Sequence, residues 1–128
     1  MRTLRRNQPL IDCWFDFLPP GQQETAQALH AAILQAVPQA DLVVRSGNLY
    51  YTAGEEFVLA LAPHRTHVHL QVLTGGEPSP AFPHLTRSGK TLMWRFKHGD
   101  PIDAAAVSRL AMVAFSVVRV PARHHART

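Results

Sequence analysis

The stretch from residue 41 to residue 72, DLVVRSGNLYYTAGEEFVLALAPHRTHVHLQV, decides the fold. Short segments rich in β-branched and aromatic residues follow one another in it: DLVVRS, NLYYTA, EFVLALA and THVHLQV. Such segments, separated by turn residues, are typical of β-strands. The connections of a few residues are too short for the crossovers that parallel strands need. The stretch therefore predicts consecutive antiparallel strands, a meander.

Two helices are predicted before these strands. In the first, apolar residues recur at the spacing of one helical face, and Pro19-Pro20-Gly21 then ends it; they are Ile11, Trp14, Phe15 and Leu18. The second helix runs from Gln22 to Val37 and ends before Pro38. Its apolar side consists of Ala26, Leu29, Ile33 and Val37. Cys13, surrounded by apolar residues, is expected to be a small core residue.

The chain after the meander predicts a loop, a fifth strand and a last helix. Residues 74–89 hold three prolines and three glycines, but Phe82 and Leu85 should hold this loop against the body. The segment TLMWRFKH resumes the alternation of a strand. The helix is expected from Ile102 to about Arg119, with Asp100 as N-cap and Pro101 at its first position. Its expected apolar stripe is Ala106, Leu110, Val113 and Val117.

These elements predict an α+β fold: a single domain with an antiparallel sheet of about five strands and helices packed on one face. The domain is expected over residues 10–119, between a basic N-terminal segment, 1–9, and a basic tail, 120–128. A chain of 128 residues fits one such domain without disulfides or metal staples. The single cysteine excludes an internal disulfide and is typical of a cytoplasmic protein. No apolar run is long enough to cross a membrane, and no signal peptide is recognisable.

The net charge of +4 is concentrated at the two ends of the chain. Between residues 7 and 118, seven basic residues face nine acidic ones. Six arginines stand outside this body: Arg2, Arg5, Arg6, Arg119, Arg123 and Arg127. No basic surface interleaved with aromatic residues is recognisable, which argues against specific nucleic-acid binding.

The alternation of two strands places a group of polar side chains on one face of the sheet. In THVHLQV, His67 and His69 point away from the valines and the leucine, and in TLMWRFKH, Arg95 and Lys97 point away from the core. If the two strands are neighbours, these four side chains can reach one small anion. Tyr50 is a further candidate ligand on the meander. The alternatives are a solvated face or one covered by a second subunit, a homodimer, since Val58, Ala60 and Met93 lie there too.

A metal site at His67 and His69 is a second hypothesis. Two imidazoles at this spacing can reach one ion, but zinc prefers three or four ligands. The remaining donors, Glu55, Glu56, His64 and His124-His125, would have to be brought in by tertiary folding. No cofactor is therefore predicted.

Three patterns in the sequence resemble enzyme motifs but lack residues that those motifs require. Gly89-Lys90-Thr91 resembles the end of a phosphate-binding loop, but His84 stands where that loop needs its first glycine. Ser46-Gly47 and Ser88-Gly89 lack the nucleophile elbow. Glu55-Glu56 is typical of a solvated turn. The sequence predicts no catalytic residue, and a non-catalytic binding or interaction module.

The order of several blocks over residues 10 to 118 resembles the YdhG-like family, a domain of unknown function (DUF1801). The blocks are WFDFLPP, VVRSGNLYY, GEEFVLALAPH, HVHL and SGKTLMWRFKHGDPID. The Trp-Gly-x-Pro frequent in the family is replaced here by residues 45–49, RSGNL, and the aromatic after the His-Val-x-Leu block by Gln71-Val72. The resemblance implies the fold. Some family members are described as frataxin-like iron chaperones, which implies metal handling by His67 and His69 as the alternative function.

Overall fold

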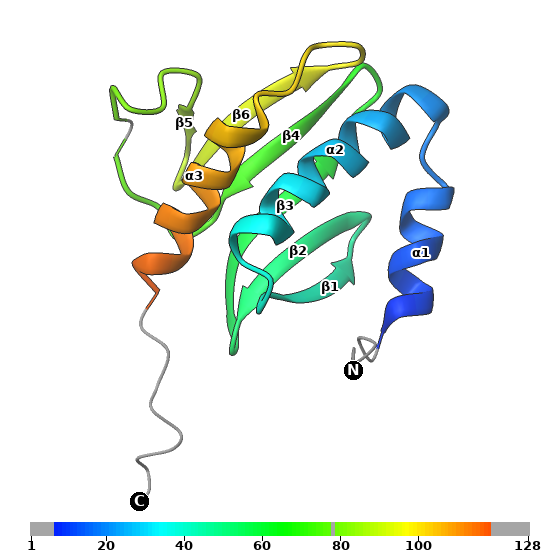
Figure 1. The fold of residues 1–128 in the computed structure, drawn as a ribbon, viewed down its shortest axis with the longest axis horizontal. Helices are drawn as coiled ribbons and strands as arrows, with labels where there is room; N and C mark the ends of the chain where they lie inside the picture. The colour runs from blue at the N-terminus through cyan, green and yellow to red at the C-terminus, as the bar shows by residue number, and fades with distance from the viewer. Residues whose placement is uncertain (1–6, 78, 119–128) are drawn as a thin grey trace, which may run out of the picture.

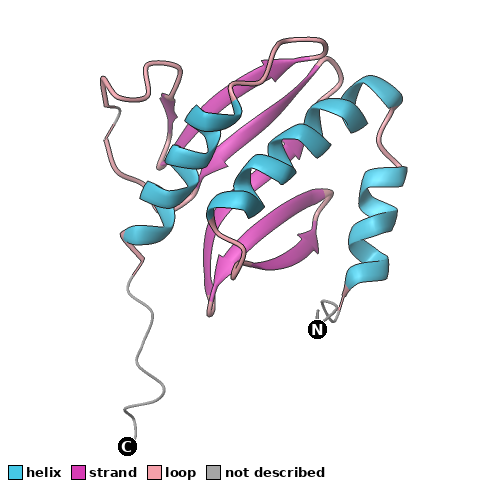
Figure 2. Ribbon diagram, in the orientation of Figure 1, coloured by secondary structure: helices cyan, strands magenta, loops and turns pink. Residues whose placement is uncertain are grey.

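A computed structural model describes residues 7–77 and 79–118 of the chain. Within these ranges, helices and one antiparallel sheet form two layers (Figure 1, Figure 2). The helices are α1 (Gln8–Asp16), α2 (Pro20–Ala36) and α3 (Ala104–Ser116). The strands are β1 (Asp41–Arg45), β2 (Asn48–Ala53), β3 (Glu56–Pro63), β4 (His67–Val72), β5 (Thr86–Ser88) and β6 (Thr91–Lys97). The predicted α+β fold with an antiparallel sheet is confirmed.

The sheet has the strand order β1-β2-β3-β4-β6-β5, and every neighbouring pair is antiparallel. The meander from residue 41 to 72 is therefore present as predicted, and β6 adds to its β4 edge. The helices α2 and α3 cross the same face of the sheet (Figure 1). The side chains predicted to face them are all buried: Val68, Leu70, Val72, Leu92, Trp94 and Phe96.

The first two helices bury the stripes that the sequence predicts. Ile11, Trp14 and Phe15 are buried on α1, and Ala26, Leu29 and Ile33 on α2. The prediction for Cys13 is wrong, because its side chain is exposed. It lies two residues from Ile11, and that spacing turns it away from the buried face. The second helix also begins at Pro20 and not at Gln22, since proline lacks only an N–H that the first turn leaves unpaired.

The last helix differs from the expectation in its start and in its buried face. The N-cap is Asp103, whose Oδ1 accepts a hydrogen bond from the N–H of Ala106 at 3.1 Å. Asp100 instead accepts one from the N–H of Lys97 at 2.9 Å. The buried residues are Val107, Leu110, Ala111 and Ala114, whereas the predicted stripe residues Val113 and Val117 are exposed. Because the helix is apolar on nearly every side, periodicity alone cannot select the face that packs on the sheet.

The loop after β4 contains the additional strand β5, which pairs with β6. Its residues, Thr86–Ser88, are all exposed and do not alternate, so no strand signal was readable. Leu85 is buried and Phe82 packs against the core, as predicted. In the described ranges, no helix is long and apolar enough to span a membrane.

The predicted terminal segments fall largely outside the described residues. This applies to residues 1–6 of the N-terminal segment and to the whole tail, residues 120–128. Since α1 starts at Gln8, the folded part begins two residues before the predicted boundary at residue 10.

Candidate functional site

Three histidines meet at the turn between β3 and β4. The turn is closed by a backbone hydrogen bond from the N–H of His64 to the carbonyl of His67, 2.7 Å long. It folds the ring of His64 back onto the strand, with centroid distances of 5.1 Å to His67 and 4.2 Å to His69. The rings of His67 and His69 are 4.6 Å apart, because residues i and i+2 of a strand share one face. We call His64, His67 and His69 the histidine cluster.

Cationic side chains lie next to the histidine cluster on β6. This strand pairs directly with β4, and the register sets His67 opposite Lys97 and His69 opposite Arg95. The two strands are thus neighbours, which is the condition under which these side chains can reach one small anion. Arg95 and Lys97 are both exposed, so their charged ends are accessible to a solute. Within the described ranges, no helix covers this face of the sheet (Figure 1).

His69 is the most buried member of the cluster. Only 9% of its surface is exposed, and its Nε2 has no hydrogen-bond partner among the described residues. On the β3 side it faces Ala62, whose methyl group offers neither donor nor acceptor. An unpaired buried polar atom costs free energy, and such exceptions often mark an absent ion, water or ligand.

The two histidines on β4 resist protonation. Burial lowers the pKa of His69 to about 4, and the neighbouring His64, His67 and Arg95 add to the effect. The pKa of His67 is lowered as well, by burial and then by Arg95, His64 and His98. Protonation of both rings is therefore disfavoured, and every positive charge brought near them disfavours it further.

The helix α2 fixes the turn that carries the cluster. Gln22, which is buried, donates through Nε2 to the backbone carbonyls of His64 and of Arg65, the latter at 3.2 Å. From the other side, the N–H of His98 donates to the carbonyl of Thr66 at 3.4 Å. These contacts join residues far apart in the sequence, so neither Gln22 nor His98 carried a sequence signal. His64 was visible only as a histidine before the strand.

Tyr50 does not join the cluster. It lies on β2, opposite Ala60, so that β3 separates it from β4. Its ring contacts Phe57 at a centroid distance of 5.0 Å, and Asn48 donates to its hydroxyl at 3.4 Å. Val58 and Ala60 have no exposed surface, so they add no apolar patch for a second subunit.

A hollow of about 340 Å³ lies beside Arg95 at the other side of β6. It is lined by His84, Thr86, Met93, Trp94 and Arg95. The ring of His84 stacks on Trp94 with a centroid distance of 5.4 Å. Arg95 thus borders both the hollow and the histidine cluster, and a small solute held by its guanidinium has room there.

The donors around the cluster do not form a metal centre. In the described part of the chain, no group of three or more His, Cys, Asp or Glu side chains is arranged so that it could hold an ion. His64 contributes a third ring, but not a third converging donor. Glu55 and Glu56 lie at the opposite end of β3, and His124-His125 lie outside the described residues.

Comparison of the chain with protein-family models, with curated proteins and with solved structures found no match. The resemblance to the YdhG-like family therefore stays a prediction from the sequence.

Proposed function

We propose that the chain is a non-catalytic binding module that takes a small anion on the open face of its sheet. The ligands would be the histidine cluster and Arg95, with Lys97 adding charge at the rim. The single observation that carries the proposal is the Nε2 of His69, buried without a hydrogen-bond partner among the described residues, on a residue that pairs across the strands with Arg95. An anion oxygen between the two side chains would supply both with a hydrogen-bond partner.

The electrostatics of the cluster favour this ligand class. The guanidinium of Arg95 presents a planar fork of donors suited to oxyanions. The pKa of His69 and that of His67 are lowered partly by Arg95, so a negative charge placed there would raise both. Anion binding and proton uptake by the cluster should therefore be linked, with tighter binding at lower pH.

The alternative is a metal-handling protein of the frataxin-like iron-chaperone kind, with His67 and His69 as ligands. The lowered pKa of each ring favours it, since a metal ligand must be unprotonated. Two observations weigh against it: Arg95 and Lys97 stand beside the rings, and the described residues offer no third converging donor.

Anion binding is tested by thermal unfolding in phosphate and in sulfate, with chloride at the same ionic strength as reference. We expect both oxyanions to raise the Tm, and to raise it more at pH 6 than at pH 8. The response should be lost in an Arg95→Ala, His69→Ala variant. Arg45→Ala is the matched control, because Arg45 is exposed on β1, away from the histidine cluster. Its Cζ lies 5.0 Å from the ring centroid of Phe57.

The proposal fails if neither oxyanion stabilises the protein beyond chloride, or if the double variant responds like the wild type. The metal alternative is separated by titration with Co²⁺ and Fe²⁺ of protein that carries no histidine tag. Stoichiometric binding that is lost in His67→Ala and unchanged in Arg95→Ala would favour the metal over the anion.

A further inference from the structure

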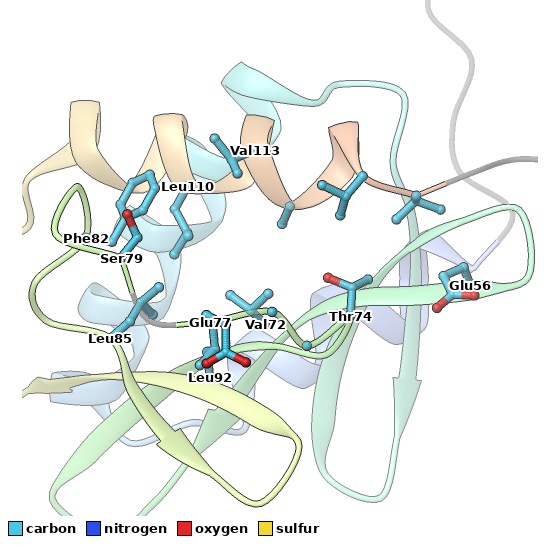
Figure 3. Close-up of a pocket in the computed structure, with 15 residues that line it drawn as sticks. Glu56, Val72, Thr74, Glu77, Ser79, Phe82, Leu85, Leu92, Leu110 and Val113 are labelled. Atoms are coloured by element: carbon cyan, nitrogen blue, oxygen red, sulfur yellow. The ribbon is translucent and has the colours of Figure 1, made fainter.

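A cavity of about 620 Å³ lies between the end of α3 and the sheet, on the helix side and away from the histidine cluster (Figure 3). Strands β4 and β6, helix α3 and the loop before β5 all contribute to its wall. The main apolar side chains are Val72, Phe82, Leu85, Leu92, Leu110 and Val113.

The cavity is open and not a packing defect of the core. Protein interiors are close-packed, with few voids larger than a water molecule. Here Val113 and Val117 line the cavity and are nevertheless 49% and 65% exposed, so its apolar wall is accessible to solvent. A largely apolar hollow of several hundred Å³ with a few polar groups is typical of a pocket for a small organic molecule.

The charged groups of the cavity are acidic. Glu56 and Glu77 line it, and none of the described residues that line it is basic. Glu77 is paired with Arg87, Oε1 to Nη2 3.2 Å, whereas no ion pair joins Glu56 to another described residue. In Figure 3, Phe82 and Leu110 lie towards one end of the cavity and Glu56 at the other, with Thr74 between. Glu77 lies at the first end, beside Val72 and Leu92, so Glu56 is the charged group drawn at the other end.

We propose that this cavity binds an amphipathic organic cation, an unbranched alkylamine or a molecule with such a tail. The alkyl chain would lie among Phe82, Leu92 and Leu110, where it leaves water. The ammonium group would point to Glu56, whose exposed carboxylate has no ion-pair partner among the described residues. An alkyl carboxylate of the same length would meet the like charge of Glu56 at that end.

The test measures binding of octylamine, octanol and octanoate to the full chain by calorimetry, below the concentration at which the amine self-associates. We expect saturable binding of octylamine at least about tenfold tighter than that of octanoate, with octanol between them. Glu56→Gln should weaken octylamine binding by about two- to fivefold, the range for a partly solvated ion pair, and leave octanol unchanged. Glu55→Gln is the matched control, since Glu55 is exposed in the same turn and does not line the cavity.

A second pair of variants tests the location. Val113→Trp would place an indole in the cavity and should weaken the binding of all three ligands. Met112→Trp, on the same helix and 52% exposed, lies outside the lining residues and should not. The proposal is overturned if no ligand binds saturably, if octanoate binds as tightly as octylamine, or if the members of either variant pair behave alike. The stabilisation by phosphate that tests the proposed function depends on His69 and Arg95, which do not line this cavity. Its outcome is therefore independent of these results.

Discussion

His69 on β4 lies directly opposite Arg95 on β6, the former buried and the latter exposed. The pairing sets a buried imidazole beside the residue that carries an exposed guanidinium. Burial is the largest cause of the lowered pKa of His69, and the neighbouring His64, His67 and Arg95 add to it. The ring is consequently uncharged under conditions in which an exposed histidine is partly protonated.

The first prediction concerns stability in mild acid. The pKa of His69 is about 4 in the folded protein against 6.5 for a free histidine, so between these values the unfolded chain binds the extra proton. The free energy of unfolding should therefore fall as the pH falls through this window. From pH 7.5 to pH 5 the loss attributable to His69 is about 2 kcal/mol. Urea unfolding at a series of pH values measures it.

The matched variants for this experiment are His69→Gln and His84→Gln. The first removes the titrating group, so its free energy of unfolding should depend less on pH. The second alters an exposed histidine that stacks on Trp94, outside the histidine cluster. The free energy of unfolding of this variant should depend on pH as that of the wild type does. An equal pH dependence of the free energy of unfolding in the wild type and in His69→Gln would contradict the assignment of this dependence to His69.

The second prediction concerns the charge of Arg95. Arg95→Gln should raise the pKa of His67 and that of His69, since Arg95 lowers both. Because burial is the larger cause in each case, neither pKa should return to its ordinary value. Titration of the imidazole signals by NMR gives the two pKa values. Arg65→Gln, in the turn itself, is the control, and similar increases in both variants would refute a specific role for Arg95.

The third prediction concerns the attachment of the turn to α2. Gln22→Leu leaves the carbonyls of His64 and Arg65 without their donor and should lower the free energy of unfolding by about 1–3 kcal/mol. The ring of His64 should also become more mobile, which line broadening of its NMR signals would report. Gln27→Leu changes an exposed glutamine of the same helix and should stay within about 0.5 kcal/mol. Indistinguishable variants would show that the link does not hold the turn.

The fourth prediction concerns the start of α3. Asp103→Ala removes the N-cap and should cost about 1 kcal/mol of stability. Amide exchange separates this residue from Asp100: the N–H of Ala106 should lose protection in Asp103→Ala, and that of Lys97 in Asp100→Ala. Loss of protection at the N–H of Asp103 in the Asp100 variant would instead favour the cap position expected from the sequence, since an N-cap bonds the N–H three residues on.

Local patterns predicted much of this fold, because each depends on residues close in the chain. The alternation in β4 and β6 assigned Val68, Leu70 and Trp94 to the core and the histidines to the other face. Proline and glycine marked the C-terminal end of α1 and turns of the meander. The same reasoning was wrong for α3, where apolar residues occur all round the helix and several stripes are equally compatible with the sequence.

The sequence by itself determined the meander, the faces of its strands and the presence of His67, His69, Arg95 and Lys97 on one of them. Only the tertiary structure decided that the ring of His64 folds back onto His67 and His69 and that Gln22 holds the turn between β3 and β4. It also decided that Tyr50 lies too far from the histidine cluster to join it. It also decided where α3 leaves a cavity above the sheet. The physical reason is the same in each case: periodicity fixes the direction of a side chain, whereas burial and the approach of distant groups depend on how the layers pack.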